Sequence, residues 1–133
     1  QAGKLSEQEI KAAFAEAISA RPEAPQRFTL YFLEGRDELT AESKKDMEKV
    51  LAEVRRRPAP DVIVVGHTDR VGSLQDNDRL ALRRAERLRS DLLKQGLPAD
   101  SVQAAGRGER EPLVVTADEV AEPRNRRVEM LVR

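Results

Sequence analysis

The chain has 133 residues, the usual size of one domain with a single core of modest size. Its 24 basic and 24 acidic side chains cancel, so no net positive field attracts nucleic acid, and we expect no nucleic-acid partner. The absence of cysteine excludes disulfides and thiolate chemistry, and one histidine leaves little material for a metal centre or acid-base catalysis. The composition therefore argues against an enzyme and predicts neither a metal nor a cofactor.

The beginning of the chain carries no targeting signal that we recognise. No run approaches the roughly 20 apolar residues of a membrane span, and no basic segment precedes an apolar one. Because Gln1 is not a natural start, we expect a processed or truncated chain, with any signal peptide or lipid-bearing cysteine upstream. Membrane contact is then expected only through such an absent upstream anchor.

Residues 6–20 are predicted to form a short amphipathic helix. Ser6 and Glu9 have the spacing of a capping box, and apolar residues follow at helical intervals. Two prolines then end the helix, so we expect residues 1–26 to form a helix with a proline-rich connector and residues 27–133 to form the main domain. Three roles are open for this helix: packing on the main domain, docking on a missing upstream region, or acting as a tether.

The main domain alternates predicted strands and helices. In chain order we expect a strand at 28–32, a helix at 41–56, a strand at 61–66, a helix at 73–95, and strands at 101–105 and 127–133. Thr40 and Ser73 are suited to cap the two helices, and the almost wholly apolar strand at 61–66 is typical of the interior of a sheet.

This order, β-α-β-α-β-β, predicts an α+β fold in which two helices pack on one face of a mixed sheet as a two-layer α/β sandwich. The two crossovers favour parallel neighbouring strands, and the last pair can be antiparallel. Residues 107–123 are expected to form a long excursion with a short helix around Asp118. The alternating apolar residues of the last strand predict that it is half-buried.

A strand-to-helix turn carries the most informative pattern of the chain, Gly66–Asp69 followed by Asn77 and Arg84. Asp69 follows an apolar strand, so we expect it in the crevice beyond the carboxyl end of that strand, where open α/β sheets bind ligands. Asn77, Leu80 and Arg84 lie on one face of the next helix and can reach the same crevice. A carboxylate beside a guanidinium suits a ligand that carries both an ammonium and a carboxylate.

Each of these residues also has a structural interpretation. Aspartate is common where a strand gives way to a loop, so Asp69 by itself is compatible with capping the turn. Arg84 lies among several arginines, any of which fits an ordinary solvated helix charge. A structural role is favoured for His67, because the sequence places no catalytic partner beside it.

Further motifs follow in a fixed order along residues 28–133. They are Gly66-His67-Thr68-Asp69, Gly72, Asn77, Leu80, Arg84-Ala85, Gly96, Gly106-Arg107-Gly108-Glu109, Pro112 and Asn125-Arg126-Arg127-Val128-Glu129. This ordered set, with matching gaps, resembles the OmpA-like peptidoglycan-binding domain, a two-layer α-on-β fold. In that family, residues similar in position to Asp69 and Arg84 clamp the zwitterionic end of diaminopimelate in the peptidoglycan stem peptide. The sequence departs from the family pattern at Leu33–Asp37, Ala81 and Glu122.

The resemblance implies a non-catalytic module that anchors an envelope protein to peptidoglycan, in the periplasm and associated with the outer membrane of a Gram-negative bacterium. The alternative is an OmpA-like scaffold that binds an envelope protein partner. Arg126 is expected either to contact a ligand carboxylate or to tie the last strand to the loop after Asp69. The expected ligand-binding residues are Asp69, Arg84, Asn77, Thr68, Leu80 and Arg126.

Overall fold

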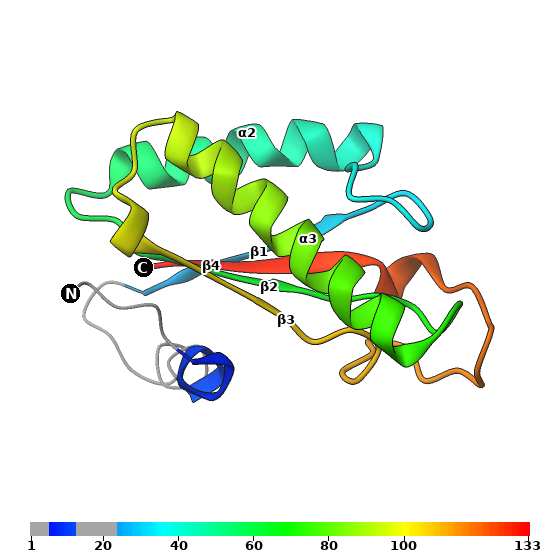
Figure 1. The fold of residues 1–133 in the computed structure, drawn as a ribbon. Coiled ribbons are helices and arrows are strands. Elements are labelled where there is room, and N and C mark those ends of the chain that lie inside the picture. Colours follow the sequence, from blue (N-terminus) through cyan, green and yellow to red (C-terminus); the bar gives the residue numbers. More distant parts are fainter. Residues whose placement is uncertain (1–5, 13–23) are drawn as a thin grey trace.

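One mixed four-stranded sheet, covered on one face by two helices, forms the body of the protein (Figure 1). The computed structural model describes residues 6–12 and 24–133. The elements are β1 (Gln26–Tyr31), α2 (Ala41–Arg56), β2 (Val62–Gly66), α3 (Leu74–Lys94), η1 (Ala99–Ser101), β3 (Val102–Gly106), η2 (Pro123–Asn125) and β4 (Arg127–Val132). The predicted α+β sandwich and the order β-α-β-α-β-β are confirmed.

The strands lie in the order β1-β4-β2-β3, which differs from the expected pairing. β2 and β3 are parallel neighbours, as expected, but β4 lies between β1 and β2 and is antiparallel to both. The expected parallel contact between the first two strands is therefore wrong, and the last two strands do not pair. The long excursion before β4 lets the chain cross the sheet, and the central position gives both edges of this apolar strand a hydrogen-bonding partner.

Local signals set the two helices as predicted. The Thr40 hydroxyl accepts a hydrogen bond from the backbone N–H of Ser43, and Ser73 caps α3 in the same way through Asp76. The apolar stripes of both helices pack on the sheet. The main core contains Leu30, Phe32, Met47, Val50, Leu51, Val54, Val62, Val64, Ala85, Leu88, Leu92, Val102, Val128, Met130 and Val132.

Two strand glycines allow α3 to lie close to the sheet. A Cβ at Gly66 would lie 1.9 Å from the carbonyl oxygen of Ala81, and one at Gly106 would lie 2.6 Å from the backbone nitrogen of Leu82. Because α3 occupies this side of both positions, the residue that follows each glycine projects toward the opposite face of the sheet.

The opposite face is covered in part by the N-terminal helix, which is helical at residues 7–12 (Figure 1). Its capping box is confirmed, since the N–H of Ser6 donates to Glu9 at 2.8 Å and the N–H of Glu9 donates to the Ser6 hydroxyl at 3.1 Å. Ile10 is only 2% exposed and packs in a second apolar cluster with Ile63, Ala105 and Leu131. Of the three roles left open for this helix, the structure shows packing on the main domain.

Two smaller expectations are wrong. The short helix of the excursion lies at Pro123–Asn125, where proline starts a 3-10 turn, and not around Asp118. β4 is buried on both faces, because the apolar cluster that holds Ile10 covers Leu131 on the face that was expected to be solvated. The remainder of the predicted N-terminal helix and its connector, residues 13–23, lies outside the described residues. Within the described part, no helix is both long and apolar enough to cross a membrane.

Candidate functional site

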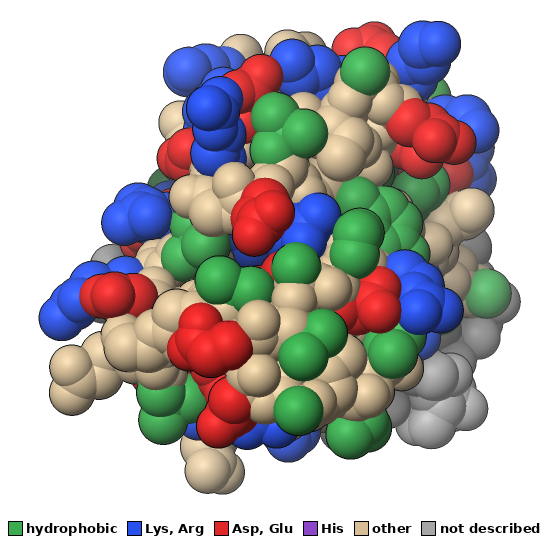
Figure 2. Space-filling view, turned by 90° about the vertical axis from the view of Figure 1, so that its right-hand side faces the viewer, with side chains coloured by type: hydrophobic (Ala, Val, Ile, Leu, Met, Phe, Trp, Pro, Cys, Tyr) green, Lys and Arg blue, Asp and Glu red, His purple; other side chains and the backbone are tan. Residues whose placement is uncertain are grey.

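Three loops meet beyond the carboxyl end of β2, at the right-hand end of the molecule in Figure 1. They are residues 32–40 after β1, residues 67–73 after β2, and the excursion of residues 107–126. Figure 2 looks onto this end, where apolar side chains and carboxylates are interspersed. Asp69 lies here, buried, in the position that the sequence predicted.

The Asp69 carboxylate is held by three donors. Its Oδ1 accepts from the N–H of Val71 at 3.2 Å, and its Oδ2 accepts from the N–H of Glu122 at 3.2 Å. Oδ2 also forms an ion pair with Nη1 of Arg126 at 2.9 Å, and both side chains are largely buried. Arg126 therefore ties the start of β4 to the loop after β2, which is one of its two expected roles.

Arg84 is completely buried beneath this loop cluster. Its Nε donates to the carbonyl of Arg36 at 2.9 Å, Nη1 to that of His67 at 2.9 Å, and Nη2 to that of Leu33 at 3.1 Å. The guanidinium carbon lies 5.1 Å from the centre of the Phe32 ring, within the range of a cation-π contact. Arg84 thus fastens the loop after β1 to the end of β2.

The environment keeps Arg84 cationic at neutral pH. Burial lowers its pKa to about 10, while the nearby carboxylate of Asp69 acts in the opposite direction. Three of the five N–H groups of the guanidinium are engaged by the carbonyls, which leaves two for a ligand. The side chain is 0% exposed, and two of its three carbonyl partners belong to the loop after β1.

The other predicted site residues are also buried near the loop after β2. They are Thr68, Asn77 and Leu80. The Thr68 hydroxyl donates to the carbonyl of Asp69 at 2.9 Å. The Asn77 amide donates to the same carbonyl at 3.2 Å and to Glu109 at 3.0 Å. The structure therefore brings the predicted residues together, and it gives Thr68 and Asn77 the task of holding the backbone of Asp69 in place.

Two further side chains support the site. They belong to the sequence motifs, but no contact was predicted for them. Glu109 accepts from Asn77 through one oxygen and from Arg70, at 3.1 Å, through the other. Asn125 is 0% exposed, and its Oδ1 accepts from the N–H groups of Leu113 and Val114. Motif spacing marks both positions, but their partners lie 11 to 39 residues away in sequence. Together they pin the excursion to the crevice.

His67 lies at the end of β2 and is 3% exposed. Burial, together with the positive charges of Arg127 and Arg107, lowers its pKa from 6.5 to about 3, so the imidazole is neutral at physiological pH. Within residues 6–12 and 24–133, no group of three or more histidine, cysteine or acidic side chains is placed to hold a metal ion.

Replacing His67 with glutamine is expected to reduce the loss of stability in acid. Between pH 6.5 and 3, His67 is protonated in the unfolded chain but neutral in the native state. The free energy of unfolding therefore falls as the pH falls through that window. Between pH 7.5 and pH 5 its contribution is about 2 kcal/mol. Urea unfolding of both proteins at the two pH values measures the difference, and an equal pH dependence in the two proteins would show that His67 is protonated in the native state.

The fold and the buried polar residues beneath the three loops define an α-on-β domain whose polar cluster lies beyond the end of a central strand. The model of the OmpA family matches residues 31–126, and the chain belongs to this family. It is 37% identical over 87 residues to outer membrane porin F of Pseudomonas fluorescens, a match that takes in 65% of this chain and only 27% of the length of that protein.

In two further comparisons, the match covers a larger share of the other protein. The chain is 33% identical over 103 residues to the peptidoglycan-associated lipoprotein of Haemophilus influenzae, across 77% of this chain and 67% of the relative. Its fold matches the crystal structure of the peptidoglycan-associated lipoprotein from Burkholderia pseudomallei with a TM-score of 0.70 and 22% identity, over 88% of this chain and 99% of that one.

Proposed function

We propose that this chain is a non-catalytic module that binds peptidoglycan through the diaminopimelate of the stem peptide and anchors an envelope protein to the cell wall. The observation that carries the proposal is the buried Asp69 carboxylate, which pairs with Arg126 at 2.9 Å and lies near enough to the buried Arg84 to act on its charge. The name of the Haemophilus influenzae relative, a peptidoglycan-associated lipoprotein, supports peptidoglycan as the ligand.

The charges of the crevice match a zwitterion. Asp69 accepts from the ligand ammonium, and the ligand carboxylate binds the guanidinium of Arg84, with Arg126 as a second cation. Thr68 and Asn77 hold the loop that carries Asp69, and the buried Leu80 lies on the same face of α3. The binding step breaks the ion pair of Asp69 with Arg126 or shares it with the ligand.

The same charges give selectivity among cell walls. A stem peptide with lysine in place of diaminopimelate carries an ammonium but lacks the second carboxylate. Such a ligand would form no charge-assisted contact with the guanidinium of Arg84 or Arg126, which disfavours that complex. We therefore expect preference for diaminopimelate-type peptidoglycan, and with it a periplasmic location at the outer membrane of a Gram-negative cell.

Sedimentation with purified sacculi tests the binding and the lack of catalysis together. The purified chain is expected to pellet with diaminopimelate-type sacculi and to release no soluble muropeptides, because the crevice holds a charge pair without a general acid-base set. Equal recovery in the supernatant with and without sacculi would refute binding. Steady release of muropeptides would show that the protein is a hydrolase.

A protein partner is the second candidate function, and the rim of the crevice favours it. Leu113, Val115 and Val120 on the excursion are 55%, 86% and 42% exposed. Exposed apolar side chains on one segment can mark a protein-binding surface. Binding of an envelope protein at this surface would be lost when Leu113 and Val115 are replaced with serine and retained when Asp69 is replaced with asparagine. Binding of the cell wall would be retained in the first variant and lost in the second.

A further inference from the structure

Three polar side chains form a row on the face of the sheet away from α2 and α3. They are His67, Arg107 and Arg127, from the ends of the three adjacent strands β2, β3 and β4. The N–H of Arg107 donates to the carbonyl of Gly66 at 2.8 Å, and the N–H of His67 donates to the carbonyl of Arg127 at 2.8 Å, which sets the three residues side by side. The contact of α3 with Gly66 directs the row to the opposite face.

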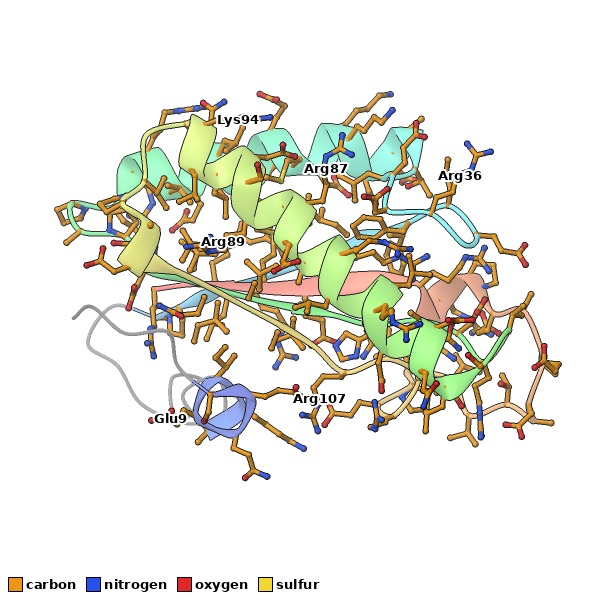
Figure 3. The ribbon with its side chains drawn as sticks, viewed as in Figure 1. Glu9, Arg36, Arg87, Arg89, Lys94 and Arg107 are labelled. Carbon is orange, nitrogen blue, oxygen red and sulfur yellow. The ribbon has the colours of Figure 1, made fainter. Side chains whose placement is uncertain are left out.

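The N-terminal helix lies against one end of this row. Glu7 forms an ion pair with Arg107, which lies beside the helix in Figure 3. Lys11 forms an ion pair with Glu111 at 2.7 Å, and Arg107 is 3.5 Å from the same carboxylate. These ion pairs join the helix to Arg107 and Glu111, while Ile10 anchors the helix on Ile63, Ala105 and Leu131.

The same segment contacts the crevice from its other side. The carbonyl of Gly108 accepts from the N–H of Thr68 at 2.8 Å, and Glu109 accepts from Asn77 at 3.0 Å. Gly108 and Glu109 directly follow Arg107, so only one or two peptide units separate the helix contact from the loop that carries Asp69.

We propose that the N-terminal helix is a positioning element for the crevice. When it is docked, it fixes residues 107–111 and thereby holds Thr68 and Asn77 in the arrangement that binds ligand. This inference rests on the proposed function, since it concerns the affinity of the same site. Helix docking and ligand binding are then coupled, so each strengthens the other.

The contacts between the N-terminal helix and the sheet suit reversible docking. Its ion pairs involve the exposed side chains of Glu7 and Lys11, which contribute little to stability. Among the described residues, three buried atoms of the row lack a hydrogen-bonding partner: Nδ1 of His67, Nε of Arg107 and Nη1 of Arg127. Such atoms oppose burial, and among the described residues of the helix Ile10 is the one apolar side chain that packs in this cluster. Ligand binding can therefore shift the docking equilibrium.

Calorimetric titration of the full chain with a soluble diaminopimelate-containing peptide tests the coupling. Ile10→Asp, which removes the anchor, is expected to weaken binding by about fivefold or more, whereas Gln8→Asp, the same change on the exposed side of the helix, is expected to have little effect. Lys11→Glu opposes Glu111 without touching the core and is expected to weaken binding in the same direction. Circular dichroism at 10 °C establishes that each variant is folded.

Hydrogen exchange supplies a readout that a purely structural role would not change. The peptide is expected to slow exchange of the helix amides, including the N–H of Ile10 that donates to Ser6, in the wild type and in Gln8→Asp. Wild-type affinity in folded Ile10→Asp and Lys11→Glu, with no change in helix exchange, would overturn the coupling and leave peptidoglycan binding intact. Failure of the wild type to bind the peptide would instead overturn the proposed function, and this inference with it.

Discussion

Replacing Arg84 with methionine is expected to lower the free energy of unfolding by about 3 kcal/mol or more and to weaken binding of a diaminopimelate-containing peptide. Arg84 is fully buried, and its loss leaves the carbonyls of Leu33, Arg36 and His67 without their donor. Methionine keeps most of the apolar volume, so the charge and the hydrogen bonds account for most of the change. Urea unfolding measures the stability, and calorimetry at low temperature measures the binding.

Arg83→Met is the matched control, because Arg83 is the preceding residue on α3 and is exposed. Surface substitutions of this kind usually change stability by less than about 0.5 kcal/mol. Similar losses in the two variants would mean that α3 acts through diffuse positive charge. That result would contradict the specific role of Arg84 in fastening the loop after β1.

Asp69→Asn is expected to weaken binding of the diaminopimelate-containing peptide by about 2 to 5 kcal/mol, because a buried charge pair loses one member. Asparagine has nearly the same shape as aspartate and retains an oxygen that accepts from the N–H of Val71. The amide nitrogen cannot accept from Glu122 or Arg126, so some stability is lost, and circular dichroism establishes that the variant is folded; the counter-charge for the ligand ammonium disappears. Asp76→Asn, an exposed carboxylate in the first turn of α3, is the control and should leave binding nearly unchanged.

The contact of Asp69 with Arg126 adds a test of coupling. The two charges lie 2.9 Å apart, so the loss from Asp69→Asn combined with Arg126→Gln should be smaller than the sum of the single losses. Strict additivity would show that the ligand does not depend on this ion pair. Unchanged affinity in Asp69→Asn alone would remove Asp69 from the site.

Local features of the fold could be predicted from the sequence. The caps at Thr40 and Ser73, the capping box of Ser6 and Glu9, and the apolar stripes of α2 and α3 all depend on residues within a few positions of one another. The position of Asp69 after an apolar strand was predictable for the same reason. These signals involve residues close together in the sequence, so the sequence alone is enough to recognise them.

Long-range features could not be predicted in this way. The place of β4 between β1 and β2 depends on competition between strand partners, which no local pattern encodes. The complete burial of Arg84 and the pairing of Arg126 with Asp69 join segments 48 to 57 residues apart. The alternating apolar residues of β4 predicted one buried face, and the sequence did not show that the N-terminal helix packs over Leu131 on the other.

Nuclear magnetic resonance titration of the ¹⁵N-labelled chain with a soluble diaminopimelate-containing peptide tests the central claim most directly. Binding in the crevice predicts saturable shifts of the backbone signals of Thr68, Asp69 and Asn77 and of the Nε–H signals of Arg84 and Arg126. The matching lysine-containing peptide should produce much smaller shifts at equal concentration. Unchanged crevice signals, or equal shifts with both peptides, would contradict the claim that this chain recognises diaminopimelate through Asp69 and its two arginines.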